Sequence, residues 1–234
     1  TEVRACLGRA RARRSAAAGC VCAGPPLQPA QMRLVSRSAS FVVRFGAPVA
    51  AIDASSCDFI LIVEKDAVFN KLIQERIWER YPCVVVTARG FPDLPTRAFL
   101  NRLASTGVQD TCKIYILVDW NPSGLWIFST YVTGGASNTN ESKRYALPNA
   151  IFLGVSHEDI LAAGKVFTAK HTKREARDIA NILRRKRGPL YSTFKTELEQ
   201  MHALGRKCEI EGLYASKNDD NYALSEYIRD KAYK

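Results

Sequence analysis

The sequence predicts an α/β fold in which a mainly parallel sheet is flanked by helices and followed by a helical C-terminal part. Short, β-branched apolar runs, beginning with FILIV at 59–63, stop abruptly at polar residues. This pattern is typical of buried parallel strands. Segments with helical spacing of apolar residues follow these runs in turn, and such alternation implies right-handed crossovers between parallel strands.

The predicted elements alternate between strand and helix from residue 59 onward. Val68, Leu72 and Ile77 share one face of the first predicted helix. Pro122 suits the first turn of a later helix, and Gly134 follows the end of that helix. The predicted strands are 59–63, 83–87, 113–118 and 150–153, and the helices between and after them are 67–81, 96–106, 122–132 and 157–163. A polar loop is expected over 136–145.

The C-terminal third is predicted to be mostly helical. Apolar residues at helical spacing indicate helices over about 172–186, 193–204 and 222–232. The segment CEIEGL at 208–213 is interpreted as a possible strand.

The N-terminal 45 residues differ in composition from the rest of the chain. They contain eight Arg and one acid, Glu2, whereas the remaining 189 residues contain 26 basic and 22 acidic side chains. An Arg-rich, acid-poor composition is typical of a transit peptide, a disordered tail or an unrelated leader. We predict a divergent, disordered tail over 1–45 and a single domain over 46–234. Because the tail carries most of the charge, the pI of 9.4 is weak support for nucleic-acid binding.

Several function classes are disfavoured by simple patterns. No apolar run approaches the roughly 18 residues that a membrane span needs, so no membrane partner is expected. The seven Cys are scattered without zinc-ligand spacing, which favours a reducing compartment, the cytosol or nucleus. The chain lacks G-x-G-x-x-G and a phosphate-binding P-loop, so a nucleotide-binding protein is the last-ranked hypothesis.

Three oxygen-bearing side chains follow predicted strands, namely Glu64, Asp119 and Asn121. In open α/β sheets, sites form just past the carboxyl ends of the strands. A Glu from one strand and a nearby Asp–Asn pair from another can converge on Mg²⁺, which prefers oxygen ligands. The alternative is that these acids are only solvated chain ends or helix N-terminal charges.

Two basic segments are candidates for contact with phosphates. Arg89 and Arg97 flank the turn RGFPDLPTR, although a structural turn with solvated arginines explains the same pattern. The run at 184–187 suits a DNA-contacting face or a nuclear targeting patch, but cations near a helix C-terminus also complement the helix dipole.

Five segments occur together in an order that resembles one family. They are VEKDAVF (63–69), TARGFPDLPTRAFLNRL (87–103), ILVDWNPSG (116–124), FLGV (152–155) and LSEYIRDK (224–231). Over about residues 46–234 the chain resembles the Toprim domain of the A subunit of DNA topoisomerase VI and of its eukaryotic relative, the meiotic transesterase that makes DNA double-strand breaks. The last segment favours the eukaryotic branch.

The resemblance implies a Rossmann-like Toprim fold, Mg²⁺ as cofactor, and DNA as substrate. It also implies a homodimer, a partner similar to the ATP-binding B subunit of topoisomerase VI, and action in the nucleus. By motif match, Glu64 and Asp119 fall on the metal-binding acids of the family, with Asn121 beside them. Lys65, Arg89 and Arg97 are expected to bind DNA.

Two departures from the family pattern leave two hypotheses open. The attacking tyrosine of the family lies in a winged-helix domain before Toprim, whereas all nine Tyr here follow Glu64, so no catalytic residue is expected in this chain. The family's D-x-D-P-x-G reads Asp119-Trp120-Asn121-Pro122-Ser123-Gly124, which removes one negative charge. The chain is therefore either the Toprim part of a DNA-cleaving enzyme or a non-catalytic DNA-binding and dimerisation relative with a degenerate metal site.

Overall fold

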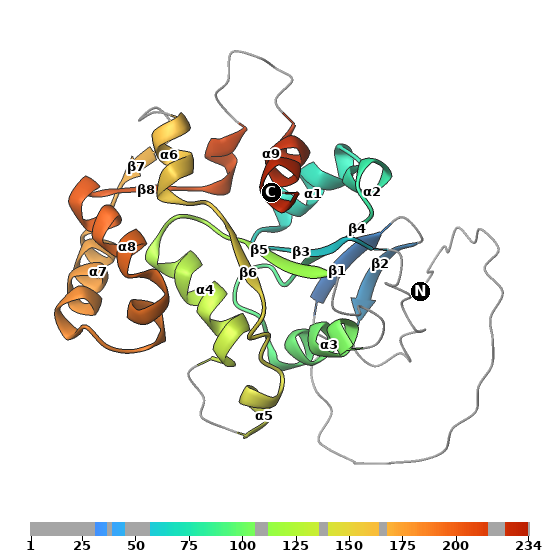
Figure 1. The fold of residues 1–234 in the computed structure, drawn as a ribbon, viewed down its shortest axis with the longest axis horizontal. Coiled ribbons are helices and arrows are strands. Elements are labelled where there is room, and N and C mark those ends of the chain that lie inside the picture. The colour runs from blue at the N-terminus through green and yellow to red at the C-terminus, as the bar shows by residue number, and fades with distance from the viewer. Residues whose placement is uncertain are drawn as a thin grey trace.

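A six-stranded sheet with the order β2-β1-β4-β3-β5-β6 forms the centre of the protein (Figure 1). The computed structural model describes residues 31–36, 39–44, 57–105, 112–135, 140–163, 168–214 and 223–233. The strands are β1 (Gln31–Ser36), β2 (Ala39–Arg44), β3 (Phe59–Val63), β4 (Cys83–Thr87), β5 (Lys113–Leu117) and β6 (Ile151–Gly154). The last four are mutually parallel, which confirms the predicted mainly parallel sheet.

The middle strand β3 brings the predicted site residues to one edge of the sheet. All five of its side chains are buried, as its uninterrupted apolar sequence predicts. Val63 lies beside Thr87 on one neighbouring strand and beside Leu117 on the other. The Glu64 N–H continues this pairing by donating to the Leu117 carbonyl at 3.1 Å. The carboxyl ends of β3 and β5 therefore meet where Glu64 and Asp119 follow them.

Helices cover both faces of this sheet, with α1, α2 and α9 on one side and α3 and α4 on the other (Figure 1). A second, two-stranded sheet lies beside α7 and α8 and is formed by β7 (Thr168–Lys170) and β8 (Arg206–Cys208). The helices are α1 (Asp66–Gln74), α2 (Ile77–Arg80), α3 (Leu94–Ser105), α4 (Pro122–Thr133), α5 (Asn140–Arg144), α6 (His157–Ala163), α7 (Lys173–Arg185), α8 (Pro189–Leu204) and α9 (Leu224–Ala232).

Three predicted elements differ from the structure. The single helix expected over 67–81 is two helices, because Arg76 adopts a left-handed conformation with φ of 50° between them. The apolar spacing did not reveal this break, since Ile77 is still buried after it. The loop expected over 136–145 contains helix α5, while 136–139 lie outside the described residues. A strand was considered possible over 208–213. In the structure only Cys208 of this segment belongs to a strand, β8, and residues 210–213 form a short 3₁₀ helix.

The sheet also extends N-terminal to residue 46, where we predicted the domain to begin. Strand β1 pairs antiparallel with β4, so that Leu34 lies beside Val86, and β2 pairs antiparallel with β1. These two strands lie within the segment that its composition assigned to a disordered tail. Residues 1–30 lie outside the described part of the chain, and their assignment to a tail stays a prediction.

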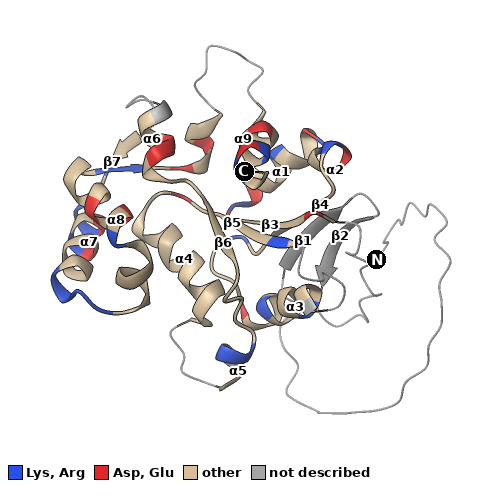
Figure 2. Ribbon diagram, viewed as in Figure 1, with Lys and Arg blue, Asp and Glu red and all other residues tan. Residues whose placement is uncertain are grey.

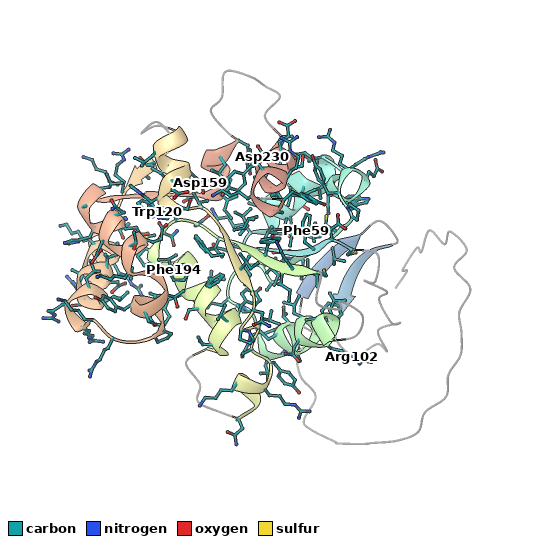
Figure 3. The ribbon with its side chains drawn as sticks, in the orientation of Figure 1. Phe59, Arg102, Trp120, Asp159, Phe194 and Asp230 are labelled. Carbon is teal, nitrogen blue, oxygen red and sulfur yellow. The ribbon has the colours of Figure 1, made fainter. Side chains whose placement is uncertain are left out.

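Aromatic packing joins the sheet to the C-terminal helices. Phe128 of α4 and Phe152 of β6 each meet Phe194 of α8, which is labelled in Figure 3, in edge-to-face arrangements with ring centroids 5.2 and 5.0 Å apart, respectively. Edge-to-face pairs of this kind place the positive edge of one ring against the negative face of the next. In the described part of the chain, no helix combines the length and the apolarity that crossing a membrane requires.

Gly124, in the first turn of α4, lies against the backbone of Asp119. A Cβ atom placed on Gly124 would be only 2.2 Å from the Asp119 carbonyl oxygen. The glycine therefore allows the N-terminus of α4 to approach the end of β5.

We predict that Gly124→Ala lowers the free energy of unfolding by about 1–3 kcal/mol, because helix α4 or the Asp119 backbone must shift. Chemical denaturation would measure the change, with the adjacent, exposed Ser123→Ala as the control. Equal stability of the two variants would contradict the close approach.

Candidate metal centre

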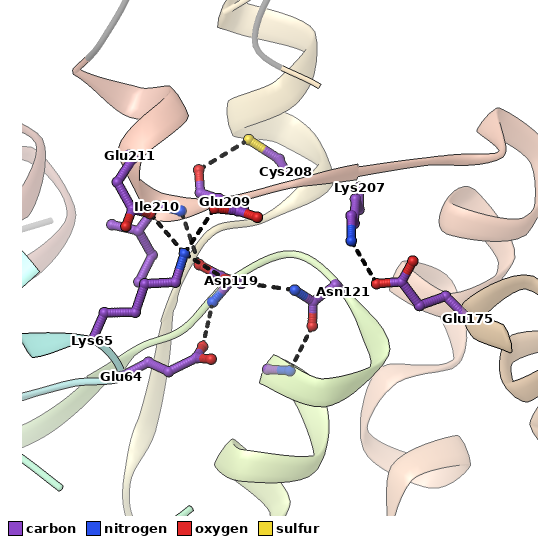
Figure 4. A network of polar contacts seen from close by, with 11 residues as sticks. Glu64, Lys65, Asp119, Asn121, Glu175, Lys207, Cys208, Glu209, Ile210 and Glu211 are labelled. Atoms are coloured by element: carbon purple, nitrogen blue, oxygen red, sulfur yellow. Dashed lines mark hydrogen bonds and ion pairs between the residues drawn. The ribbon is translucent and has the colours of Figure 1, made fainter. Parts of the chain in front are cut away.

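Glu64 and Asp119, predicted from separate strands to share one site, are in direct contact. The Asp119 N–H donates to Glu64 Oε2 at 2.9 Å (Figure 4). The Asp119 residue is 4% exposed, and its Oδ1 accepts the N–H of Ile210 at 2.9 Å. Asp119 thus links the end of β3, the end of β5 and the 3₁₀ helix after β8.

The ammonium group of Lys65 lies among three carboxylates at this edge (Figure 4). Lys65 Nζ is 3.1 Å from Asp119 Oδ2, 3.0 Å from Glu209 Oε2 and 2.8 Å from Glu211 Oε2. Sequence analysis missed the two glutamates. The alternation of Glu209 and Glu211 around the buried Ile210 was the available signal, because it indicates two acids on one side of an extended segment.

Asn121 lies beside Asp119 but uses its side chain to begin helix α4. Its Oδ1 accepts the Gly124 N–H at 2.8 Å, which is the usual role of an N-cap residue. Its Nδ2 faces Asp119 Oδ2 at 3.4 Å. In this conformation Asn121 presents a donor, not an acceptor, to the Asp119 carboxylate.

Burial in the protein raises the pKa values of both acids. Burial, supplemented by the charge of Asp119, raises the pKa of Glu64 to about 7. Burial also raises the pKa of Asp119, although the Ile210 N–H and the Lys65 ammonium oppose the shift. Burial acts to lower the pKa of Lys65, but its carboxylate partners, Glu211 first, outweigh that effect and raise it. Negative charge at this edge is therefore costly unless a cation accompanies it.

Arg89 and Arg97, expected to bind DNA with Lys65, lie outside this cluster. Arg89 is exposed, and its Nε is 3.4 Å from Asp66 Oδ1. Arg97 is 6% exposed, and its Nη1 donates to the Gly134 carbonyl at 2.7 Å, at the end of α4. Their role in DNA binding stays a prediction.

The residues present fit a magnesium ion that keeps much of its water. Among the described residues, no three Asp, Glu, His or Cys side chains are grouped so that they form a ready ligand set. Mg²⁺ does not require one, because it usually binds through one or two carboxylates and several waters. Glu64 and Asp119 supply two such carboxylates, and the Lys65 ammonium shows that positive charge is accommodated beside Asp119.

A parallel Rossmann-like sheet with an acid at the end of each of two adjacent strands defines the class as a Toprim-type α/β domain. The family model for the Toprim domain that topoisomerase 6 A subunits share with Spo11 matches residues 59–232. The chain therefore belongs to this family, which confirms the resemblance drawn from its motifs.

Named relatives come from both branches of the family. The chain is 37% identical over 180 residues to meiotic recombination protein SPO11-2 of Oryza sativa subsp. indica, a match that covers 77% of this chain and 45% of that protein. It is 35% identical over 185 residues to the A subunit of type 2 DNA topoisomerase 6 from Sulfurisphaera tokodaii, covering 75% and 47%, respectively. The chain thus spans about half the length of the curated relatives it matches.

We predict that Glu64→Gln stabilises the metal-free protein at pH 8 but not at pH 5. The folded-state pKa of Glu64 lies above the ordinary 4.5, so folding favours its protonated form, and its contribution to stability falls as pH rises through about 7. Gln does not titrate, and its amide oxygen can still accept the Asp119 N–H.

Thermal denaturation in EDTA across this pH range would measure the difference, with the exposed Glu199→Gln as the matched control. If the difference in Tm between Glu64→Gln and the parent did not depend on pH, the pKa of the Glu64 carboxyl would not be raised in the folded protein.

Proposed function

We propose that this chain supplies the Mg²⁺-binding Toprim part of a DNA-cleaving protein that makes meiotic double-strand breaks by tyrosine transesterification. The observation that carries the proposal is the joining of Glu64 and Asp119 at one sheet edge, on the motif positions where the family has metal-binding acids. The SPO11-2 relatives, named for meiotic recombination, support the meiotic branch.

In this proposal Glu64 and Asp119 hold the ion, and Asn121 adds its amide oxygen when that oxygen leaves the Gly124 N–H. Bound Mg²⁺ supplies positive charge that stabilises the phosphate undergoing transfer. The Ile210 N–H holds Asp119 Oδ1 in place, and Oδ2, which now contacts the Lys65 ammonium, would be the oxygen offered to the ion. Lys65 compensates the charge of Asp119 in the metal-free protein, and its contacts to Glu209 and Glu211 would hold the ammonium when an ion takes its place beside Asp119.

The remaining parts of the proposal rest on the family. The nucleophile is a tyrosine of a winged-helix domain, and two copies of the protein act together, one on each DNA strand. An ATP-binding partner similar to the topoisomerase VI B subunit completes the assembly, which acts in the nucleus.

A specific observation favours a second candidate, a DNA-binding and dimerisation relative that does not cleave. Asn121 replaces a carboxylate of the family pattern and is engaged as the N-cap of α4. The site then carries one negative charge fewer, which weakens affinity for Mg²⁺. Formation of a covalent protein–DNA adduct in Mg²⁺ by the complete protein with its B-type partner supports the first candidate, and DNA binding without an adduct supports the second.

We predict that Asp119→Asn abolishes the Mg²⁺-dependent tightening of DNA binding. The amide keeps an oxygen for the Ile210 N–H, but it removes the charge that binds the ion. Fluorescence anisotropy with a labelled duplex, with and without Mg²⁺, would measure this.

Glu199→Ala, which removes an exposed carboxylate on α8, provides the control. If Asp119→Asn responded to Mg²⁺ as the parent does, the assignment of Asp119 to the metal would be wrong.

We also predict that Lys65→Met enlarges the stabilisation of the protein by Mg²⁺. Without the ammonium, three carboxylates face one another unpaired, so the metal-free protein is less stable and the ion meets no competing cation. The shift of Tm between EDTA and Mg²⁺ would measure the effect.

Lys71→Met, which removes a cation that pairs with Glu75 at 3.2 Å on α1, is the matched control. A smaller Mg²⁺ shift in Lys65→Met than in the parent would mean that Lys65 assists metal binding instead of competing with it.

A further inference from the structure

Uncompensated positive charge is concentrated on α7 and the turn that follows it. The segment 173–187 contains seven bases and two acids, whereas the other residues of 46–234 contain 19 bases and 20 acids. Its exposed cations, which we call the basic face, are Lys173, Arg174, Arg177, Arg184, Arg185, Lys186 and Arg187. Figure 2 shows them as blue ribbon along α7 and into the turn before α8.

The cations of α7 point in a common direction. At about 100° per residue, the five between Lys173 and Arg185 fall within an arc of about 120° that contains no acid. Ile179 lies on the opposite side of the helix and is buried. Arg174 contacts Asp178 only at 3.9 Å, and in the described part of the chain no ion pair is found for Arg185. The basic face is therefore a solvent-facing stripe of largely unneutralised charge.

Lys186 occupies a backbone position that favours glycine. It is the residue at which α7 ends, with φ of 47° and ψ of 36° in the left-handed region. Glycine is the usual residue there, because a Cβ is unfavourable in this conformation. Lys186→Gly therefore removes the charge at a position whose backbone conformation glycine adopts without strain.

The basic face is also firmly connected to the metal centre. Thr172 and Glu175 form a reciprocal capping box at the start of α7. Glu175 Oε1 is in turn 2.8 Å from Lys207 Nζ on β8 (Figure 4). The next residue, Cys208, exchanges backbone hydrogen bonds with Trp120, the neighbour of Asp119. This continuous set of contacts fixes α7 relative to the proposed metal site.

We propose that the basic face binds the phosphate backbone of duplex DNA, as a contact area separate from the metal edge. The proposal rests on the proposed function for the identity of the ligand. From Lys173 to Arg185 the helix rises about 18 Å, which matches about five phosphate spacings along one strand. Because arginine and lysine contacts to phosphate carry no sequence information, this binding is independent of base sequence.

Of the three cations expected from the sequence to bind DNA, Lys65 and Arg97 are engaged within the protein and Arg89 is exposed but paired with an acid, which strengthens this assignment. Lys65 is surrounded by carboxylates, Arg89 contacts Asp66, and Arg97 is buried against the Gly134 carbonyl. If the metal edge alone contacted the DNA backbone, the DNA phosphates would lie against the carboxylates of that edge. The basic face supplies attraction where those acids are absent.

The test measures binding of the full chain to a labelled duplex of random sequence, in EDTA, over a series of salt concentrations. Arg185→Ala/Arg187→Ala should weaken binding about tenfold at low salt and make the slope of log K against log salt shallower by about 1.8, because two phosphate contacts are lost. Lys186→Gly should weaken binding while raising Tm, a combination that a purely structural role does not produce. Arg80→Ala/Arg144→Ala removes the same charge from exposed positions elsewhere and should leave the slope unchanged.

If both basic-face variants kept the affinity for DNA and the salt slope of the parent, the proposal would be overturned. An acidic protein would then be the better candidate for a partner of this face. Losses as large in the Arg80→Ala/Arg144→Ala control would also overturn it, because they would reflect net charge alone. Acetylation footprinting locates the contact directly: duplex DNA should protect Lys173 and Lys186 but not the exposed Lys143.

Failure of the proposed metal site is distinguishable from failure of this proposal. Glu64→Gln should remove the Mg²⁺-dependent rise of Tm that the parent shows, whereas Arg185→Ala/Arg187→Ala should keep that rise. The basic-face variants could lose DNA binding while Mg²⁺ raises the Tm of neither the parent nor any variant. That result would support the basic face and reject the metal site.

Discussion

Hydrogen bonding at Asp119 joins segments that lie far apart in the sequence. Its N–H reaches the Glu64 carboxylate, its Oδ1 accepts from Ile210, and its carbonyl lies against Gly124. A buried carboxylate is tolerated only where hydrogen bonds and opposite charge compensate for lost solvation. The parallel register of β3 and β5 provides that compensation, because it places the Glu64 carboxylate within reach of the Asp119 backbone. The packing of α4 and of the 3₁₀ helix after β8 depends on the same residue.

Lys65 offsets part of the negative charge of this edge. Glu64, Asp119, Glu209 and Glu211 gather near one another, and Lys65 contacts three of the four. Removing one partner of a buried pair costs more than the pair contributes, because the remaining charge is left uncompensated. If the site binds Mg²⁺ as we propose, a resident cation on a long, flexible side chain would compensate the acids while the ion is absent. The lysine stem can move without disturbing the backbone hydrogen bonds that hold Asp119.

The strands and the two acids were predictable from the sequence because their signals are local. Every residue of FILIV is apolar, which predicts a buried strand. An acid that directly follows such a strand must lie at the edge of the sheet where the strand ends. Glu209 and Glu211 were not predictable as neighbours of Lys65, since 144 and 146 residues separate them from it and only the β8 pairing with Trp120 brings them together. The burial of Arg97 was likewise not predictable, because an arginine beside a turn is usually exposed to solvent. Its Gly134 partner lies 37 residues away.

In the function that we propose, opposite charges on two parts of the domain would allow one small fold to hold both a metal ion and DNA. The metal edge needs acids, and those acids repel the phosphates that the ion is meant to approach. Affinity supplied by a separate basic face holds the duplex through many weak, salt-sensitive contacts, so the metal edge does not have to attract it. Mg²⁺ held by Glu64 and Asp119 would offset the negative charge that repels phosphate at this edge. Replacement of one family carboxylate by Asn121 acts in the same direction: it lowers the repulsion of phosphate at the edge while also lowering affinity for the ion. A chain with a weakened metal site and an intact basic face would therefore keep DNA binding after losing metal-dependent chemistry, which is why the two functions must be measured separately.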